Sequence, residues 1–315
     1  MKKPTPSRSD RGRPAPADKP GSKPGSKPGS KPGAKPSGTS GAKSGAKSGG
    51  TFGVKPTGKP GAPRRKPAKP RKPPVASDPN GPMRLNRYIA HAGICSRREA
   101  DVLITSGVVT VNGEVVTELG RTVLPSDHVQ VGTDRIRPEA KRYVLLNKPR
   151  GFITTLDDPQ GRRTVMELVR NACKERLVPV GRLDRDTTGL LLFTNDGDLA
   201  DRLTHPRNGV RKLYHVTLAE KVQQHHLDEI QTGFVLDDGF VKADQISFAG
   251  NDPHEVGIEL HSGRNRIVRR IFEHFGYKVA KLDRVRFAHL TKKDLPRGHF
   301  RHLSEEEVNF LRMNA

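Results

Sequence analysis

The first 80 residues of the chain are unsuited to a folded core. They hold 17 of the 26 prolines and only four strongly apolar side chains. A repeat that starts at Gly21 brings a proline every fourth residue, which forbids a helix, while its glycines prevent a stiff extended rod. Such a segment cannot bury enough surface to offset its chain entropy. We therefore expect residues 1–82 to be a disordered tail, and the folded part to follow it.

The same segment carries most of the positive charge. It has 20 Lys and Arg against three Asp, a net charge of +17, whereas the other 235 residues hold 37 basic and 31 acidic side chains, a net charge of +6. A polyanionic partner is indicated, and RNA or DNA fits better than a membrane because the tail has almost no apolar residues to insert. The tail is then either a loose polycation that raises the local RNA concentration or a spacer that aids solubility.

Several classes of protein are excluded by simple counts. No apolar run approaches the ~20 residues of a membrane span, and the basic start lacks the apolar stretch of a secretory signal. Two cysteines, Cys95 and Cys173, are too few for a disulfide scaffold or a four-cysteine zinc site. We expect a monomer in the cytoplasm.

A small module is predicted over residues 83–135. A short helix from Arg84 to Ala92 precedes a capping box, Ser96 with Glu99, which opens a second helix that stops at Gly107. A hairpin follows, turned by Asn112-Gly113, and residues 123–131 are expected to form one further strand pair. A linker, 135–141, leads to the next domain.

Four arginines of this module are candidates for docking RNA, because guanidinium groups and helix N-termini both suit phosphate oxygens. They are Arg84, Arg87, Arg97 and Arg98. The segments 84–90, 96–100 and 109–113 resemble the small RNA-binding domain shared with ribosomal small-subunit protein four. That resemblance implies that the module binds RNA.

The second domain, residues 141–315, mixes strands and helices in an irregular order. Residues 143–147, 190–194, 212–218 and 256–261 are expected strands. Helices are predicted after capping residues Thr164 and Ser304, over 198–204, and in the basic stretch that ends at Gly276. Because no βαβ repeat is visible, we predict an α+β fold with a mixed, mainly antiparallel sheet and flanking helices.

The densest chemistry lies between Gly181 and Gly197. Asp184, Asp186 and Asp196 lie with two arginines in a glycine-bounded segment against an apolar strand, where catalytic groups often lie. A carboxylate there could be a base, a nucleophile or a metal ligand. The calcium-loop pattern fails, because no glutamate closes the loop. A metal-dependent phosphodiesterase is nevertheless kept as an alternative.

The segments Gly181 to Asp184 and Thr188 to Leu190 resemble the signature of RNA pseudouridine synthases. Similar segments follow the same order over about residues 83–312; they are 146–151, 212–216, 263–270 and 298–303. The branch it most resembles carries the N-terminal RNA-binding domain and modifies ribosomal RNA. Residues 155–162 and 203–206 resemble the sub-branch that modifies large-subunit RNA, which we favour over the small-subunit alternative. The expected partner is therefore ribosomal RNA or a pre-ribosomal particle, and a non-catalytic RNA-binding assembly factor is the alternative.

The resemblance implies a role for five residues. Asp184 is the catalytic carboxylate, Arg269 pairs with it, and Tyr214 stacks on the uracil. Arg182 helps to hold the target nucleotide out of its stack, and Leu260 packs below the base. Because the reaction breaks and remakes one base–sugar link without oxidation or group import, no cofactor and no metal are expected.

Further substrate contacts are predicted in two places. Arg264, Arg266 and Arg270 surround Arg269 in the basic motif, and a helix there places Arg266 and Arg270 on one face. Lys148, at the end of its strand, is expected to contact the RNA backbone. Ile267 stands where the branch usually has glutamine, and we expect it to alter packing and leave activity intact.

Overall fold

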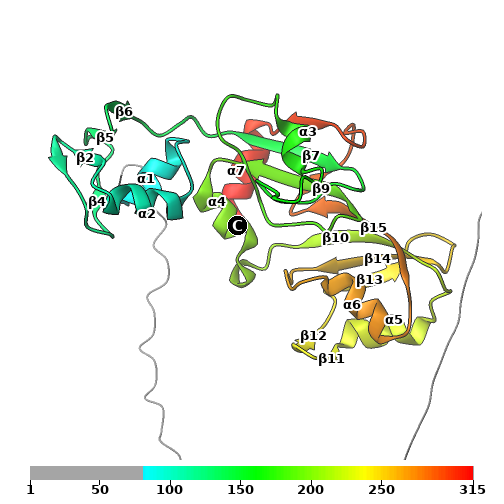
Figure 1. Ribbon diagram of the computed structural model, residues 1–315. Helices are drawn as coiled ribbons and strands as arrows, with labels where there is room; N and C mark the ends of the chain where they lie inside the picture. Colours follow the sequence, from blue (N-terminus) through cyan, green and yellow to red (C-terminus); the bar gives the residue numbers. More distant parts are fainter. Residues whose placement is uncertain (1–80, 315) are drawn as a thin grey trace, which may run out of the picture. The chain divides into compact units, whose positions relative to one another are not determined.

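The computed structural model describes residues 81–314, so the predicted tail lies outside the described residues apart from its last two positions. The predicted α+β class is confirmed: a small helical and sheet module is followed by a larger mixed sheet with helices against it (Figure 1). Among residues 81–314, we find no helix with the length and apolar character needed to span a membrane.

The small module has the two predicted helices and the predicted hairpin. Ser96 and Glu99 form the expected reciprocal capping box, and Asn112 and Gly113 both adopt positive φ, +52° and +87°, as a type I′ turn requires. Buried side chains of both helices pack against the sheet. The elements are β1 (Met83–Arg84), α1 (Leu85–His91), α2 (Arg97–Thr105), β2 (Val109–Val111), β3 (Glu114–Val115), β4 (Thr122–Val123), β5 (Val129–Val131) and β6 (Asp134–Ile136).

Two expectations for this module were wrong. Residues 123–131 do not pair with one another, because β4 pairs with β1 while β5 lies between β2 and β6. The predicted linker also begins too early, since Asp134–Ile136 is the edge strand of the four-stranded sheet and Ile136 is buried. The sequence could not show these pairings, because short strands carry too few alternating residues to identify their partners.

The larger part is built on one sheet, in the order β13-β14-β10-β15-β9-β7-β17. Its first elements are β7 (Tyr143–Lys148), α3 (Val165–Val169), β8 (Val178–Pro179), β9 (Thr187–Thr194), α4 (Gly197–Thr204), a 3-10 turn (Pro206–Asn208), β10 (Lys212–Leu218) and α5 (Gln224–Thr232). The remaining elements are β11 (Phe234–Leu236), β12 (Gly239–Val241), β13 (Gln245–Phe248), β14 (Glu255–Leu260), α6 (Ile267–His274), β15 (Val279–Phe287), β16 (Leu290–Thr291), β17 (Phe300–His302) and α7 (Glu305–Met313).

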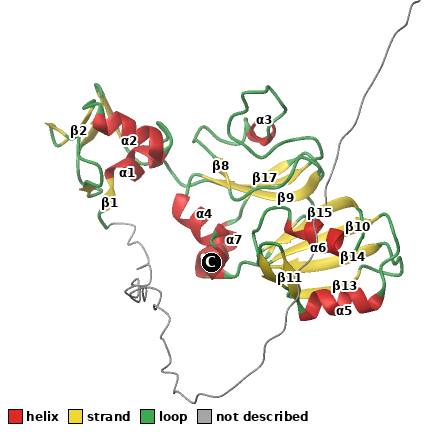
Figure 2. Cartoon of the chain, turned by 60° about the horizontal axis from the view of Figure 1, so that its bottom comes forward, coloured by secondary structure: helices red, strands yellow, loops and turns green. Residues whose placement is uncertain are grey.

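The centre of this sheet is apolar on both faces. Along β9, Leu190 and Leu192 pack toward α4 and α7, whereas Leu191 and Phe193 pack toward α3. A separate core lies where β10 and β14 meet α5 and α6, and Figure 2 shows α5 running alongside β13. Strands buried on both faces read as continuous apolar runs, which is why residues 190–193 contain no polar residue.

Strands β9 and β15 form the parallel pair of this otherwise antiparallel sheet, with Leu282 opposite Thr187 and Arg284 opposite Gly189. Gly189 has a φ of +103°, and a Cβ there would lie 2.2 Å from the carbonyl oxygen of Arg284. Glycine is therefore required for the two strands to approach each other. The sequence analysis did not anticipate β15, although this strand contributes a wall of the site described next.

Candidate active site

Asp184 lies in the loop between β8 and β9, and hydrogen bonds between Leu183 and Thr154 fix this loop. Leu183 is buried; its amide donates to the Thr154 hydroxyl, which in turn donates to the Leu183 carbonyl at 2.8 Å. Gly181 adopts a φ of +73°, so the chain turns sharply as it leaves β8. The backbone around the carboxylate is thus fixed by contacts on both sides of it.

Lys148 lies beneath this loop and was misjudged from the sequence. Its side chain is fully buried, and its ammonium donates to the carbonyl oxygens of Pro149, Asp184, Arg185 and Thr187 at 2.7–3.3 Å. Burial lowers the pKa of Lys148 from 10.5 to about 8. The predicted contact with the RNA backbone is wrong, because the ammonium is fully used inside the protein and positions the Asp184 loop.

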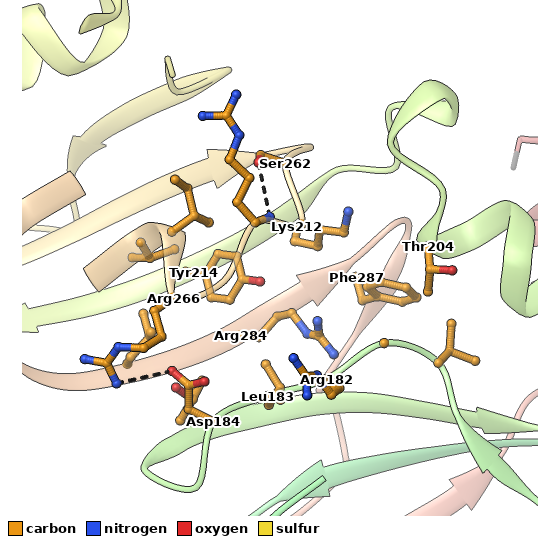
Figure 3. A pocket seen from close by; sticks show the side chains of 18 of the residues that line it. Arg182, Leu183, Asp184, Thr204, Lys212, Tyr214, Ser262, Arg266, Arg284 and Phe287 are labelled. Carbon is orange, nitrogen blue, oxygen red and sulfur yellow. Dashed lines mark hydrogen bonds and ion pairs between the residues drawn. The ribbon is translucent and has the colours of Figure 1, made fainter. Parts of the chain in front are cut away.

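Two arginines approach the carboxylate of Asp184. Its Oδ2 lies 3.8 Å from Nε of Arg269 and 3.9 Å from Nη1 of Arg266, and the side chain remains 36% exposed. Figure 3 shows Arg266 and Asp184 pointing toward each other across the mouth of a pocket. The structure thus places the predicted arginine beside the aspartate and adds a second one, in a cleft more open than the sequence led us to expect.

Tyr214 projects into the same pocket from β10. Arg284 of β15 lies opposite Tyr214. This pairing arises because the register with β15 shifts by one residue between Leu213 and Tyr214. The pocket lies among the β8–β9 loop, β10, β15 and the start of α6; its volume is about 180 Å³, and Asp184, Tyr214 and Arg284 all line it. Residues far apart in sequence therefore converge on one hollow (Figure 3).

Two buried cations in this pocket were missed by the sequence analysis. Arg284 is 3% exposed; its Nε donates to the Leu190 carbonyl at 2.7 Å, and its Nη2 has no hydrogen-bond partner. Lys212 is buried too and donates to the His261 carbonyl. Burial lowers the pKa of both, that of Lys212 to about 8. Among residues 81–314, neither has a carboxylate within ion-pair distance.

The signal for Arg284 was present in the alternation of residues 279–287, where an arginine falls at an inward position between Leu282 and Phe287. That signal was easily overlooked because a charged residue at a core position is usually read as evidence against a buried strand.

Leu260 does not line the pocket. It is 1% exposed and belongs to the core between β14 and α6. The apolar residues that line the pocket from β15 and α6 are Leu282, Phe287, Ile267 and Val268. The predicted packing of Leu260 below a base is therefore wrong. Ile267 is buried in this wall, and its expected effect on packing or orientation stays a prediction.

The arginines of the basic motif, residues 263–270, make contacts that differ from those predicted. Arg266 precedes α6 with a φ of +47°, so it does not share a helix face with Arg270. Arg270 forms ion pairs with Asp237 and Asp238, in the turn between β11 and β12. Arg264 lines the pocket and also donates to two backbone carbonyls of that hairpin. Arg266 alone of these three is directed at Asp184.

The other candidates lie on the surface. Arg182 is exposed at the rim of the pocket. In the small module Arg84, Arg97 and Arg98 are exposed, and Arg84 stands just before α1 and not on it. Arg87 is half-buried, and burial lowers its pKa. Their contact with RNA stays a prediction.

The described residues contain no group of three or more His, Cys, Asp or Glu side chains placed to hold a metal ion. Asp186, the second acid of the loop, forms an ion pair with Arg150 at 3.0 Å. The acidic loop is therefore neutralised by arginines, and the metal-dependent alternative has no structural support in residues 81–314.

Comparisons with known proteins agree on one family. Residues 142–274 match the profile described as RNA pseudouridylate synthase, and residues 83–129 match the S4 domain. A protein of Aquifex aeolicus, named an uncharacterized RNA pseudouridine synthase, is 41% identical over 72% of this chain and 92% of its own length. The ribosomal large subunit pseudouridine synthase B of Bacillus subtilis is 40% identical, over 74% of this chain and 96% of its own.

A crystal structure of a pseudouridylate synthase has a TM-score of 0.53 and 29% identity, and the match covers 73% of this chain and 99% of the other. A dual-specificity RNA pseudouridine synthase of Escherichia coli is 37% identical over 73% of this chain and 78% of its own length. The resemblance found in the sequence is confirmed.

Proposed function

The chain belongs to the RNA pseudouridine synthase family, and we propose that it converts a uridine of large-subunit ribosomal RNA to pseudouridine with Asp184 as the catalytic carboxylate. The substrate is suggested by the named activity of the Bacillus subtilis relative. The reaction breaks the bond between ribose C1′ and uracil N1, rotates the base, and joins C1′ to C5. The proton on C5 is lost and N1 gains one, so atoms balance without a co-reactant.

The observation that carries this proposal is the convergence of Asp184, Arg266 and Arg269 on one side of a pocket with Tyr214 on the other. A carboxylate acts as nucleophile or base only when it is ionised, and neighbouring guanidinium groups favour the ionised form. Arg269 lies beside this carboxylate with its side chain 11% exposed, and a hydrogen bond from its Nη1 to the Val279 carbonyl at 3.2 Å fixes it there.

Tyr214 supplies the platform for the base. The target bond is unreachable in stacked RNA, so the uridine must leave its stack at a cost of a few kcal/mol. Stacking on an aromatic ring returns ~1–3 kcal/mol. Lys212 and Arg284 give the pocket a positive wall, which suits the negative charge that the uracil takes on when its bond to the ribose breaks. The small module, with Arg84, Arg97 and Arg98 exposed, would dock the RNA.

The experiment is a comparison of two aspartates on one loop. Asp184→Asn should abolish pseudouridine formation on an unmodified large-subunit RNA transcript while changing RNA affinity less than threefold. Asp186→Asn is the matched control, because Asp186 is exposed and pairs with Arg150 away from the pocket; it should keep near-normal activity. Normal product formation by Asp184→Asn would refute the assignment, and no product from the unaltered protein would favour the RNA-binding assembly factor.

A further inference from the structure

A second hollow adjoins the catalytic pocket. It lies between the loop after α4, the β14–α6 loop and strand β12; its volume is about 510 Å³, and Phe240, Lys242 and Arg264 line it. Thr204, Ser262, Gly263 and Arg264 line both hollows, so the two are adjacent. A nucleotide bound in the second hollow would therefore lie beside one bound in the catalytic pocket.

Phe240 is the unusual residue of this hollow. It is 56% exposed, although aromatic rings are among the side chains that gain most from burial. Its ring lies over the backbone of Gly233, where a Cβ would come within 2.3 Å of the ring. The tip of the ring thus packs closely on glycine. An aromatic side chain supported in this way offers its accessible surface to a flat partner.

The hairpin that presents Phe240 is anchored by the basic motif. Arg264 donates to the carbonyls of Gly239 and Phe240, and Arg270 pairs with Asp237 and Asp238. These contacts explain why Arg264 and Arg270 are not directed at Asp184. A short two-stranded hairpin is marginal by itself, so anchoring it at four residues keeps the ring at a fixed place beside the pocket.

We propose that this hollow binds an unstacked nucleotide of the substrate RNA next to the flipped uridine, with Phe240 as the stacking platform and Lys242 as the phosphate contact. Flipping one nucleotide removes a stacking partner from its neighbour, and an aromatic ring at the mouth of the pocket can replace that partner. The exposed Lys242, together with Arg264, which pairs with Asp238 at 3.3 Å, brings positive charge to the hollow, and this charge complements RNA and not an apolar peptide. This inference rests on the proposed function, because the occupant is part of the same RNA.

The test uses the full-length protein and an unmodified transcript of the large-subunit RNA, with single-turnover rates measured over a range of protein concentrations. Phe240→Ala and Phe240→Leu should raise the half-saturating concentration about tenfold, which corresponds to ~1.4 kcal/mol of lost stacking, and should leave the maximal rate within twofold. Phe240→Tyr should behave as the unaltered protein does. Leucine keeps the apolar volume without the flat ring, so the contrast between Leu and Tyr separates stacking from packing.

Phe310→Ala is the matched control, because it removes a ring of 48% exposure that lines neither hollow. The inference is overturned if Phe240→Leu keeps the half-saturating concentration of the unaltered protein. It is also overturned if Phe240→Tyr raises that concentration as much as Phe240→Leu does, because the ring would then serve the fold. Failure of the proposed function is distinguishable, since the unaltered protein would then make no pseudouridine in the transcript at all.

Discussion

Replacement of Lys148 by methionine tests whether one buried ammonium holds the loop that carries Asp184. Of the four carbonyl oxygens it contacts, those of Asp184 and Arg185 keep a second donor, the amides of Thr187 and Gly151. The carbonyls of Pro149 and Thr187 lose their lysine donor. A buried acceptor left without its donor costs ~1–3 kcal/mol. The two acceptors together should lower the free energy of unfolding by about 4 kcal/mol. At ~2–4 °C per kcal/mol, Tm should then fall by about 8–16 °C.

Lys212→Met is the matched control for this measurement. Lys212 is also buried, with a pKa lowered to about 8, but its ammonium contacts the single carbonyl of His261. We expect about half the loss of Tm in this variant, measured by thermal unfolding at pH 7 under identical conditions. In Lys148→Met the single-turnover rate should also fall ~100-fold, because a displacement of about 1 Å at a catalytic group can cost that much. If Lys148→Met melts within about 2 °C of the unaltered protein, or no lower than Lys212→Met, the loop is not held as described.

Three further outcomes are expected. Because burial lowers the pKa of Lys148 to about 8, the unfolded chain binds more protons than the folded one between pH 8 and 10.5. Urea unfolding should therefore show the stability of the unaltered protein, relative to Lys148→Met, rising by about 3 kcal/mol across that window; a constant difference would contradict the shifted pKa. Arg284→Met should slow single-turnover pseudouridine formation more than tenfold while RNA affinity in a filter-binding assay stays within threefold, and an unchanged rate would remove Arg284 from the pocket chemistry. Deleting residues 1–80 should weaken RNA binding more at low salt than at high salt, whereas equal losses would indicate a specific contact of the tail.

The sequence predicted those parts of the fold whose signals are local. Three kinds of signal depend only on neighbouring residues, and the structure contains all of them. They are the capping boxes at Ser96 and Ser304, the turn at Asn112 and the apolar run of β9. The pairing of β9 with β15 depends instead on residues about 95 positions apart, and no local pattern reports it.

The same distinction explains the site. Asp184, Tyr214 and Arg269 could be named from motifs, and the structure brings them to one place, although their roles remain proposals. Lys148 was misjudged, because a lysine at the end of a strand usually reaches solvent and nothing in the sequence shows four carbonyls around it. Leu260 was misjudged because the choice of strand leucine that faces a pocket depends on strand register, and Leu282 of β15 lines the pocket while Leu260 does not.

The parallel contact between β9 and β15 determines when, during its synthesis, the protein can first modify RNA. Arg284 sits on the later of these strands, and Gly189 must meet it before the pocket has its full wall. A ribosome making this chain therefore exposes Asp184 about 100 residues before its surroundings exist. At ~5–20 residues per second, the nascent protein spends about 5–20 s with an incomplete site, so it cannot modify RNA until β15 has emerged.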